Sequence, residues 1–392
     1  MQDRPIESAP ARALDSLTYP ADPRRPPARP CLSIPDKHMN LTALGWKDFF
    51  LRSVESSPDA DLVPARVFRH DRQSYTVHDG ERLRSASLLG KLLYDEHDPA
   101  SLPTVGDWTL VQPFDDQAII HDVLPRRTAF YRKEAGARTR RQVLAANIDV
   151  VFIVSALDNE FNVRRLERYL VQAAGSGALP VIILNKADLH ADATRFRSDV
   201  ERVAPDVDIV DVSALENTNI ESVRRYFEEG ITVAFLGSSG VGKSTLVNRL
   251  VGEEIQATGT VREDDSRGRH TTTRREMLLV PGGGLVVDTP GLRELQLWAD
   301  EESLGAVFSD IEQLALTCRF SDCAHDSEPD CAVRVAVDRG KLDVDRLESY
   351  NKLKRELAWL DSKQDEVAML KARRRDKEFG KLMKRINRHN PK

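Results

Sequence analysis

The sequence predicts a multidomain protein with a small N-terminal β-barrel, an α/β domain with a mainly parallel sheet, and a mainly helical, metal-binding C-terminal region. Three observations predict it. Five short strand patterns occupy residues 62–124, strand and helix patterns alternate from residue 149 onward, and three of the four cysteines lie within residues 318–331. Short strands broken by turns are typical of barrels, and alternating strands and helices are typical of a parallel sheet covered on both faces.

The overall composition describes a soluble protein with more than one domain. A length of 392 residues exceeds one typical domain, and 41% hydrophobic residues supply ample core material. No run approaches the roughly 18 apolar residues of a membrane span, and the N-terminus lacks a signal-peptide layout. Four cysteines are too few for a disulfide framework, so we expect a cytoplasmic protein. The net charge of −5 does not by itself indicate a nucleic-acid partner.

The N-terminal third divides into an arm and a barrel. Residues 1–40 are rich in Pro, Ala and Arg and predict a disordered or extended arm, in which Cys31 stands alone. Residues 41–125 predict an OB-fold, with an SH3-like barrel as the alternative. The five expected strands begin near Val63, Ser74, Ser85, Gly106 and Ala118.

A basic segment, residues 126–142, follows the barrel. It is rich in arginine, with Arg138-Thr-Arg-Arg141 near its end. Two interpretations stay open, a solvated linker between domains and a contact with a phosphate backbone.

The strongest local signal is a glycine-rich loop between an apolar run, residues 231–236, and a helical pattern, residues 245–250. This context distinguishes a phosphate-binding loop from an ordinary glycine-rich turn. Backbone N–H groups would surround the phosphates, Lys243 would reach the β- and γ-phosphates, and the Ser244 hydroxyl would bind Mg²⁺. The predicted nucleotide-binding residues here are Gly237, Ser238, Ser239, Gly240, Val241, Gly242, Lys243, Ser244 and Thr245.

Two further motifs indicate guanine. Asn185-Lys186-Ala-Asp188 ends an expected strand and matches N-K-x-D, in which Asp188 would accept hydrogen bonds from guanine N1–H and N2–H₂. Asn185 would contact the base edge and the Lys186 stem would cover the base. Ser213-Ala214 follows another strand and matches S-A-x, whose backbone meets guanine O6. Adenine lacks the donor pair that Asp188 requires, so an ATP-using enzyme is disfavoured.

The residues expected to sense the γ-phosphate lie later in the chain. Asp288-Thr-Pro-Gly291 matches D-x-x-G, with Asp288 near Mg²⁺ and Gly291 at the γ-phosphate. One of the threonines at 271–273 would complete the magnesium shell, and we favour Thr272. Leu292 stands where many GTPases carry a water-orienting Gln, and an aliphatic side chain cannot orient water. His270 is therefore the candidate catalytic residue beside Lys243, Asp288 and Gly291, the alternative being an exposed loop histidine.

The order of these motifs is unusual. N-K-x-D and S-A-x precede the phosphate loop, whereas ordinary GTPases carry them after D-x-x-G. The same sheet can form from another starting point of the chain, so residues 143–298 predict a circularly permuted P-loop GTPase domain. In this order D-x-x-G leads directly into the C-terminal region.

That region, residues 299–392, contains a predicted zinc site. Cys318, Cys323, His325 and Cys331 form a Cys₃His set, which is typical of one closed structural Zn²⁺ rather than of unrelated thiols. Beyond helical periodicity up to residue 370, residues 371–392 hold ten Lys and Arg against two acids. This basic tail suits RNA phosphates, a solvated helix being the alternative.

Taken together, these motifs resemble the ribosome small-subunit-dependent GTPase family (RsgA/YjeQ). The resemblance spans residues 41–370 and rests on the barrel, the stretch 136–147, the motif order, the phosphate loop, His270-Thr-Thr-Thr273 and the zinc residues. It implies GTP hydrolysis stimulated by the 30S subunit, a role in late 30S maturation, and three domains that bind 16S rRNA. It also supports a catalytic role for His270. The arm before residue 41 lies outside it.

Two functional hypotheses follow. The first is a monomeric GTPase, using GTP, Mg²⁺ and one structural Zn²⁺, that acts on the small subunit with no DNA or membrane partner. The second is an RNA-binding scaffold whose GTP/GDP site is regulatory without useful turnover. The intact Lys243, Ser244 and Asp288 favour the enzyme.

Overall fold

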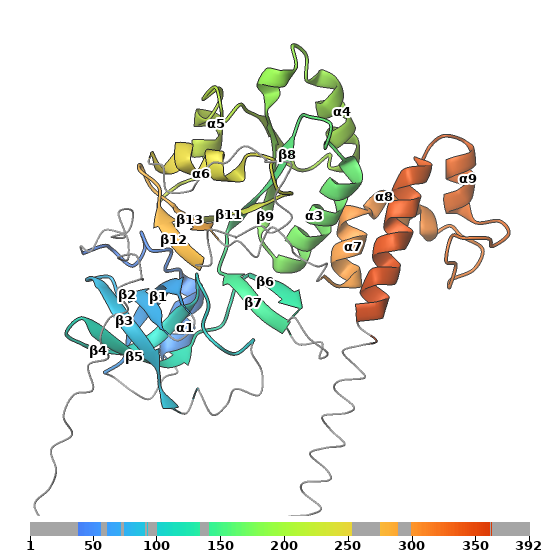
Figure 1. Cartoon of the computed structure of the whole chain (residues 1–392). Helices are drawn as coiled ribbons and strands as arrows, with labels where there is room; N and C mark the ends of the chain where they lie inside the picture. Colours follow the sequence, from blue (N-terminus) through green and yellow to red (C-terminus); the bar gives the residue numbers. More distant parts are fainter. Residues whose placement is uncertain are drawn as a thin grey trace, which may run out of the picture. The chain divides into compact units, whose positions relative to one another are not determined.

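The computed structural model in Figure 1 describes residues 38–55, 61–71, 74–90, 92, 100–133, 141–252, 275–288, 299–360 and 362. Residues 1–37 of the predicted N-terminal arm, with Cys31, and the basic tail lie outside the described residues. Among the described residues, no helix combines the length and the apolarity that crossing a membrane requires.

The N-terminal barrel is an OB-fold, as predicted. Its strands follow the order β1-β2-β3-β5-β4, and a further β1–β4 pairing closes the barrel. β3 and β5 run parallel, while the other pairs are antiparallel. Alternate residues point inward, so Val67, Val77 and Ile120 meet in the core. The elements are α1 (Asp48–Glu55), β1 (Val63–His70), β2 (Tyr75–His78), β3 (Leu83–Leu88), β4 (Trp108–Phe114) and β5 (Gln117–Val123).

The basic segment forms structure that the sequence did not predict. β6 (Ala129–Lys133) and β7 (Arg141–Ala146) pair as an antiparallel hairpin. Arg126 donates to both carboxylate oxygens of the buried Asp107 at 2.8 and 2.7 Å, and Arg127 donates to Asp149 at 2.8 Å. These two guanidinium groups therefore hold the barrel and the α/β domain, which leaves fewer arginines of the segment for a phosphate backbone.

The α/β domain is built on a mainly parallel sheet. Its strands follow the order β10-β9-β8-β11-β13-β12, in which only β12 is antiparallel to its neighbour. Phe152 and Val154 of β8 pack with Leu246 and Leu250 of the helix after β11. The strands are β8 (Val150–Ala156), β9 (Leu179–Asn185), β10 (Asp208–Asp211), β11 (Thr232–Leu236), β12 (Arg275–Leu279) and β13 (Leu285–Asp288).

One helix of this domain has a capping residue at each end. α3 (Val163–Ser176) begins after Asn162, whose side chain accepts a hydrogen bond from the Arg165 N–H, and it ends at Gly177 with φ +80°. The other helices are η1 (Ala187–Leu189), α4 (Thr194–Val203), α5 (Glu221–Arg224) and α6 (Lys243–Val251).

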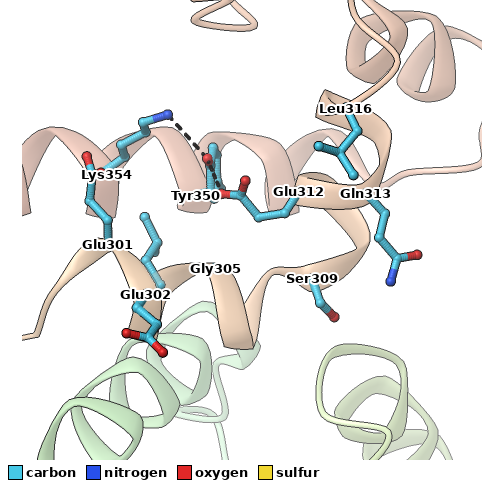
Figure 2. Close-up of a pocket in the computed structure, with 10 residues that line it drawn as sticks. Glu301, Glu302, Gly305, Ser309, Glu312, Gln313, Leu316, Tyr350 and Lys354 are labelled. Atoms are coloured by element: carbon cyan, nitrogen blue, oxygen red, sulfur yellow. Dashed lines mark hydrogen bonds between the residues drawn. The ribbon is translucent and has the colours of Figure 1, made fainter. Parts of the chain in front are cut away.

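The C-terminal domain is mainly helical, as predicted. It contains α7 (Glu301–Val307), α8 (Ser309–Ala315), α9 (Ala332–Asp338) and a long helix over residues 344–360. A pocket of about 550 Å³ lies between α7, α8 and the long helix. Figure 2 shows Tyr350 in this pocket, where its hydroxyl donates to Glu312 at 2.7 Å and accepts from Lys354 at 3.4 Å. None of the predicted nucleotide residues lines it.

Candidate functional site

The phosphate loop lies between β11 and α6, as predicted, and two of its glycines are sterically required. Gly237 has φ +144°, and a Cβ there would lie 2.3 Å from the Val154 carbonyl oxygen. Gly242 has φ +95°, and a Cβ there would lie 2.2 Å from Asn185 Nδ2. Only glycine accommodates both the backbone conformation and this close approach.

The loop encloses the side chain of Lys243. Lys243 is 7% exposed, and its ammonium donates to the carbonyl oxygen of Gly237 at 2.7 Å and to that of Ser238. Ser244 and Thr245 follow in the first turn of α6, and Ser239 and Gly240 form the exposed tip of the loop. The loop therefore places a cation and a helix N-terminus on one surface, the arrangement that binds phosphate.

Asn185 joins three segments that are far apart in the sequence. Its Nδ2 donates to the Val241 carbonyl oxygen at 2.8 Å, and its Oδ1 accepts from the Ala214 N–H at 3.0 Å. The side chain is 2% exposed. The N-K-x-D element, the S-A-x element and the phosphate loop thus meet at one edge of the sheet. Contact of Asn185 or Ala214 with a guanine base stays a prediction.

The remaining guanine-motif residues surround this junction. Lys186 has φ +63° and donates to Asp158 at 2.8 Å. Partial burial opposes a charge on Asp158, yet the hydrogen bond from Lys186 holds its pKa below the usual value. Asp188 lies in η1 with an exposed side chain, open to a ligand. Ser213 is buried and its Oγ accepts from the Glu216 N–H at 3.1 Å, which fixes the turn after β10.

Asp288 is the last residue of β13, which runs parallel to β11. Asp288 therefore lies beside the strand that leads into the phosphate loop. Its role as a magnesium ligand stays a prediction. His270, Thr272, Gly291 and Leu292 lie outside the described residues, so their predicted roles stay predictions.

The four predicted zinc ligands come together in the C-terminal domain. The ligand atoms of Cys318, Cys323, His325 and Cys331 lie within 4.8 Å of one another. Cys318 Sγ lies 3.8 Å from Cys331 Sγ, and His325 Nδ1 lies 3.7 and 3.5 Å from these two sulfurs.

The three distances among Cys318, His325 and Cys331 fit the edges of a tetrahedral zinc site. Zn–S bonds near 2.3 Å and Zn–N bonds near 2.0 Å give tetrahedron edges of about 3.8 Å between sulfurs and about 3.6 Å between sulfur and nitrogen. Glu328 supports the loop, because its carboxylate accepts the N–H groups of Ala324, Asp326 and Ser327. These hydrogen bonds, that from Ala324 first, lower the pKa of Glu328 to about 2.

Known proteins resemble this chain in sequence and in fold. A sequence model of the RsgA GTPase family matches residues 123–298. The small ribosomal subunit biogenesis GTPase RsgA of Opitutus terrae is 45% identical over 340 residues, covering 84% of this chain and 93% of the relative. The chain belongs to the RsgA GTPase family. A second RsgA relative, from Vibrio parahaemolyticus, is 41% identical and covers 88% of this chain and 92% of its own length.

Solved structures agree with the fold of an RsgA family member. The crystal structure of YjeQ from Thermotoga maritima matches with a TM-score of 0.58 at 28% identity, over 76% of this chain and 99% of that one. YloQ, described as a circularly permuted GTPase, shares the fold with a TM-score of 0.54 at 24% identity, over 76% of this chain and 96% of its own. The predicted circular permutation is therefore confirmed.

Two contacts of the RsgA-type site were not predicted from the sequence. Arg249 of α6 donates to the carbonyl oxygens of Ala214 and Leu215 at 3.1 and 3.0 Å, which holds the S-A-x loop. Arg165 of α3 donates to Ser238 Oγ in the phosphate loop at 2.8 Å. Neither arginine belongs to a motif with fixed spacing, and arginines on helix surfaces are common, so the sequence offered no signal for them.

Proposed function

We propose that this protein hydrolyses GTP to GDP and phosphate and acts in the assembly of the small ribosomal subunit. One observation supports this most strongly. Asn185 joins the loop that holds phosphates to the two elements that read guanine, although the chain presents them in permuted order. The names of the relatives, small ribosomal subunit biogenesis GTPases, supply the assembly partner.

The proposed roles of the residues are those that their motifs predict. Lys243 and the backbone N–H groups of the loop bind the phosphates, and Asp188 accepts the guanine N1–H and N2–H₂ donors. Ser244 and Asp288, with Thr272, offer the hard oxygen ligands that Mg²⁺ prefers. When bound, Mg²⁺ neutralises charge that develops on the β- and γ-phosphates.

His270 is the proposed catalytic residue, because Leu292 cannot orient the attacking water. An imidazole nitrogen can accept a hydrogen bond from that water and hold it in line with the γ-phosphate. We expect slow hydrolysis by the protein alone and faster hydrolysis with the small subunit. His270→Ala should retain GTP binding and lose the stimulated rate; an unchanged stimulated rate would remove His270 from the mechanism.

The zinc ion has a structural role in this proposal. Four protein ligands close the tetrahedral set and leave no position for a substrate. The ion would fix the loop over residues 318–331 against the helices of the C-terminal domain.

We propose that the basic tail, rather than the described part of the C-terminal domain, contacts 16S rRNA. Residues 299–360 hold 14 acidic residues against eight Lys and Arg, which repels a polyanion, whereas residues 371–392 hold ten Lys and Arg against two acids. Removal of residues 371–392 should therefore weaken subunit binding at low salt and reduce its salt dependence. An unchanged salt dependence would place the phosphate contacts elsewhere.

Phosphate release tests the enzyme against the scaffold hypothesis. Steady-state release from GTP is measured with the full chain, with and without purified small ribosomal subunits, and with ATP in place of GTP. The proposal predicts a subunit-stimulated rate with GTP only. Binding of GTP and of subunits without stimulated turnover would favour the regulatory scaffold, and efficient turnover of ATP would contradict both.

A further inference from the structure

Helix α3 contacts both the phosphate loop and the C-terminal domain, through two different faces. Residues 164, 167, 168 and 171 share one face, because residues three and four apart lie on the same side of a helix. Arg165 and Tyr169, also four apart, form the neighbouring face. The first face contacts the C-terminal domain, where Arg168 pairs with Glu356. The second face contacts Ser238 through Arg165.

The loop-facing side holds Ser238 with two side chains. Arg165 donates to Ser238 Oγ at 2.8 Å, and the Tyr169 hydroxyl lies 3.4 Å from the same atom. The start of α3 is itself fixed, because the Asn162 side chain caps the N–H of Arg165 at 3.1 Å. Ser238 is the second residue of the phosphate loop and also supplies a carbonyl oxygen to Lys243.

The other side is attached to the long helix over residues 344–360. Arg168 forms a two-pronged ion pair with Glu356, at 2.6 and 2.7 Å. Glu167 is fully buried and accepts from Arg346 at 2.9 Å. Val171 packs in the hydrophobic core of the C-terminal domain, beside Phe308 and Tyr350. Two-pronged and buried ion pairs of this kind fix relative orientation well.

We propose that α3 couples the nucleotide site to the C-terminal domain, with Arg165 as a positioning residue for the phosphate loop. The inference rests on the proposed guanine-nucleotide site and adds a regulatory connection to it. A nucleotide that shifts Ser238 changes the position of α3, and with it the docking of the long helix. By thermodynamic reciprocity, the docking of the C-terminal domain changes nucleotide affinity by the same factor.

The variant Glu356→Gln tests the coupling in the full-length, zinc-loaded protein. Glu356 lies in the C-terminal domain and is partly exposed, so the change removes one charge without opening the core. The matched control is Glu201→Gln, which removes the carboxylate of an exposed ion pair with Arg197 on α4, 3.0 Å apart. Fluorescently labelled GDP and the nonhydrolysable analogue GppNHp are the probes, and their dissociation constants are measured for both variants.

We expect Glu356→Gln to change nucleotide affinity by about 2- to 30-fold, the range that residues along a coupling route produce. The control should match the wild type. In a Ser238→Ala background, Glu356→Gln should lose most of its effect, because the contact that transmits it is gone. If Glu356→Gln acted independently of Ser238, its effect on nucleotide affinity would be the same in both backgrounds and would add to that of Ser238→Ala.

Amide hydrogen exchange of the wild-type protein, measured with and without GDP, tests the coupling without any variant. GDP should change the hydrogen-exchange rates of amides in residues 344–360, which are far in sequence from the nucleotide-binding motifs. Unchanged exchange together with wild-type affinity of Glu356→Gln would overturn the coupling and leave the GTPase proposal intact. If the wild type bound no guanine nucleotide, both proposals would fall.

Discussion

The side chain of Asn185 connects two other loops, because its amide nitrogen donates to one and its amide oxygen accepts from the other. Burial of an amide is tolerated only when its donors and acceptors are paired, and Val241 and Ala214 supply the partners. The close approach of Asn185 to the phosphate loop is possible because residue 242 has no side chain.

Replacing that glycine should therefore disrupt nucleotide binding. Gly242→Ala places a Cβ 2.2 Å from Asn185 Nδ2 and forces a non-glycine residue to φ +95°. Strain of this kind costs about 1–3 kcal/mol, so GTP affinity should fall at least about fivefold. Isothermal titration with GTP and with GDP measures it.

The matched control is Gly252→Ala at the end of α6. Gly252 also has a positive φ, +83°, but a Cβ there meets no atom within 4 Å. It should cost stability and leave nucleotide affinity unchanged. Equal loss of affinity in both variants would mean that the contact with Asn185 has no special role.

The sequence predicted the residues that lie in motifs and missed those defined by the fold. Lys243, Asn185 and Asp188 were found because their spacing from a strand end is fixed by the chain itself. Arg165 and Arg249 were missed because their partners, Ser238 and Ala214, are distant in the sequence and become neighbours only after folding.

At the scale of elements, the junction of barrel and α/β domain is a direct strand pairing. β1 pairs with β12 through Arg69–Glu276 and His70–Arg275, and Arg69 donates to Glu276 at 2.8 Å. The five barrel strands and the alternation of the α/β domain were predictable from local patterns. The hairpin β6–β7 was not predictable, because its charged residues interrupt the apolar pattern of a strand. The pairing of β1 with β12 was not predictable either, because Arg69 and Glu276 are 207 residues apart in the sequence.

This junction predicts a pH dependence of stability. Burial first, and then the charge of Arg275, lower the pKa of His70 from 6.5 to about 4, although Asp71 acts in the opposite direction. Between these pH values the unfolded chain binds more protons than the folded one. Stability is therefore lost as the pH falls from about 6.5 toward 4, by up to about 3 kcal/mol.

The variant His70→Phe keeps a ring that can stack on Tyr75 and removes the titration. Unfolding by urea, measured at several pH values between 7 and 4, should show a shallower loss of stability than in the wild type. His38→Phe, which replaces an exposed histidine, is the control. A pH profile of His70→Phe parallel to that of the wild type would be the contrary result.

The loop over residues 318–331 predicts a dependence on zinc. Cys331 is 3% exposed and packs in the core of the C-terminal domain, so loss of the ion exposes a site inside that core. Cys331→Ser should lower zinc content from one ion per chain and destabilise the C-terminal domain, since structural zinc contributes directly to folding. Atomic emission and circular dichroism measure the two effects.

Cys31→Ser is the matched control, since Cys31 stands apart from the other cysteines in the sequence. It should leave zinc content unchanged. A native protein purified without chelators and containing no zinc would contradict the assignment.

At the scale of the whole molecule, the permuted order explains how the domains are connected. D-x-x-G ends the α/β domain and leads into the C-terminal domain, while α3 supplies a second contact between them. The sequence predicted the permutation because the motifs keep their identity in any order. The ion pairs that join α3 to the long helix required the structure.

In the proposed function, segments from three parts of the permuted chain form one guanine-specific site, and the variant Asp188→Asn tests this specificity. In the proposed site the carboxylate of Asp188 would accept two donors of guanine, whereas an amide would present a donor to the C2 oxygen of xanthine. Discrimination by a site that hydrogen-bonds its substrate reaches about 10⁴–10⁵-fold. We expect Asp188→Asn to lose GTP affinity by at least about 100-fold and to bind xanthosine triphosphate instead. Unchanged preference for GTP, in a variant that stays folded, would contradict the account.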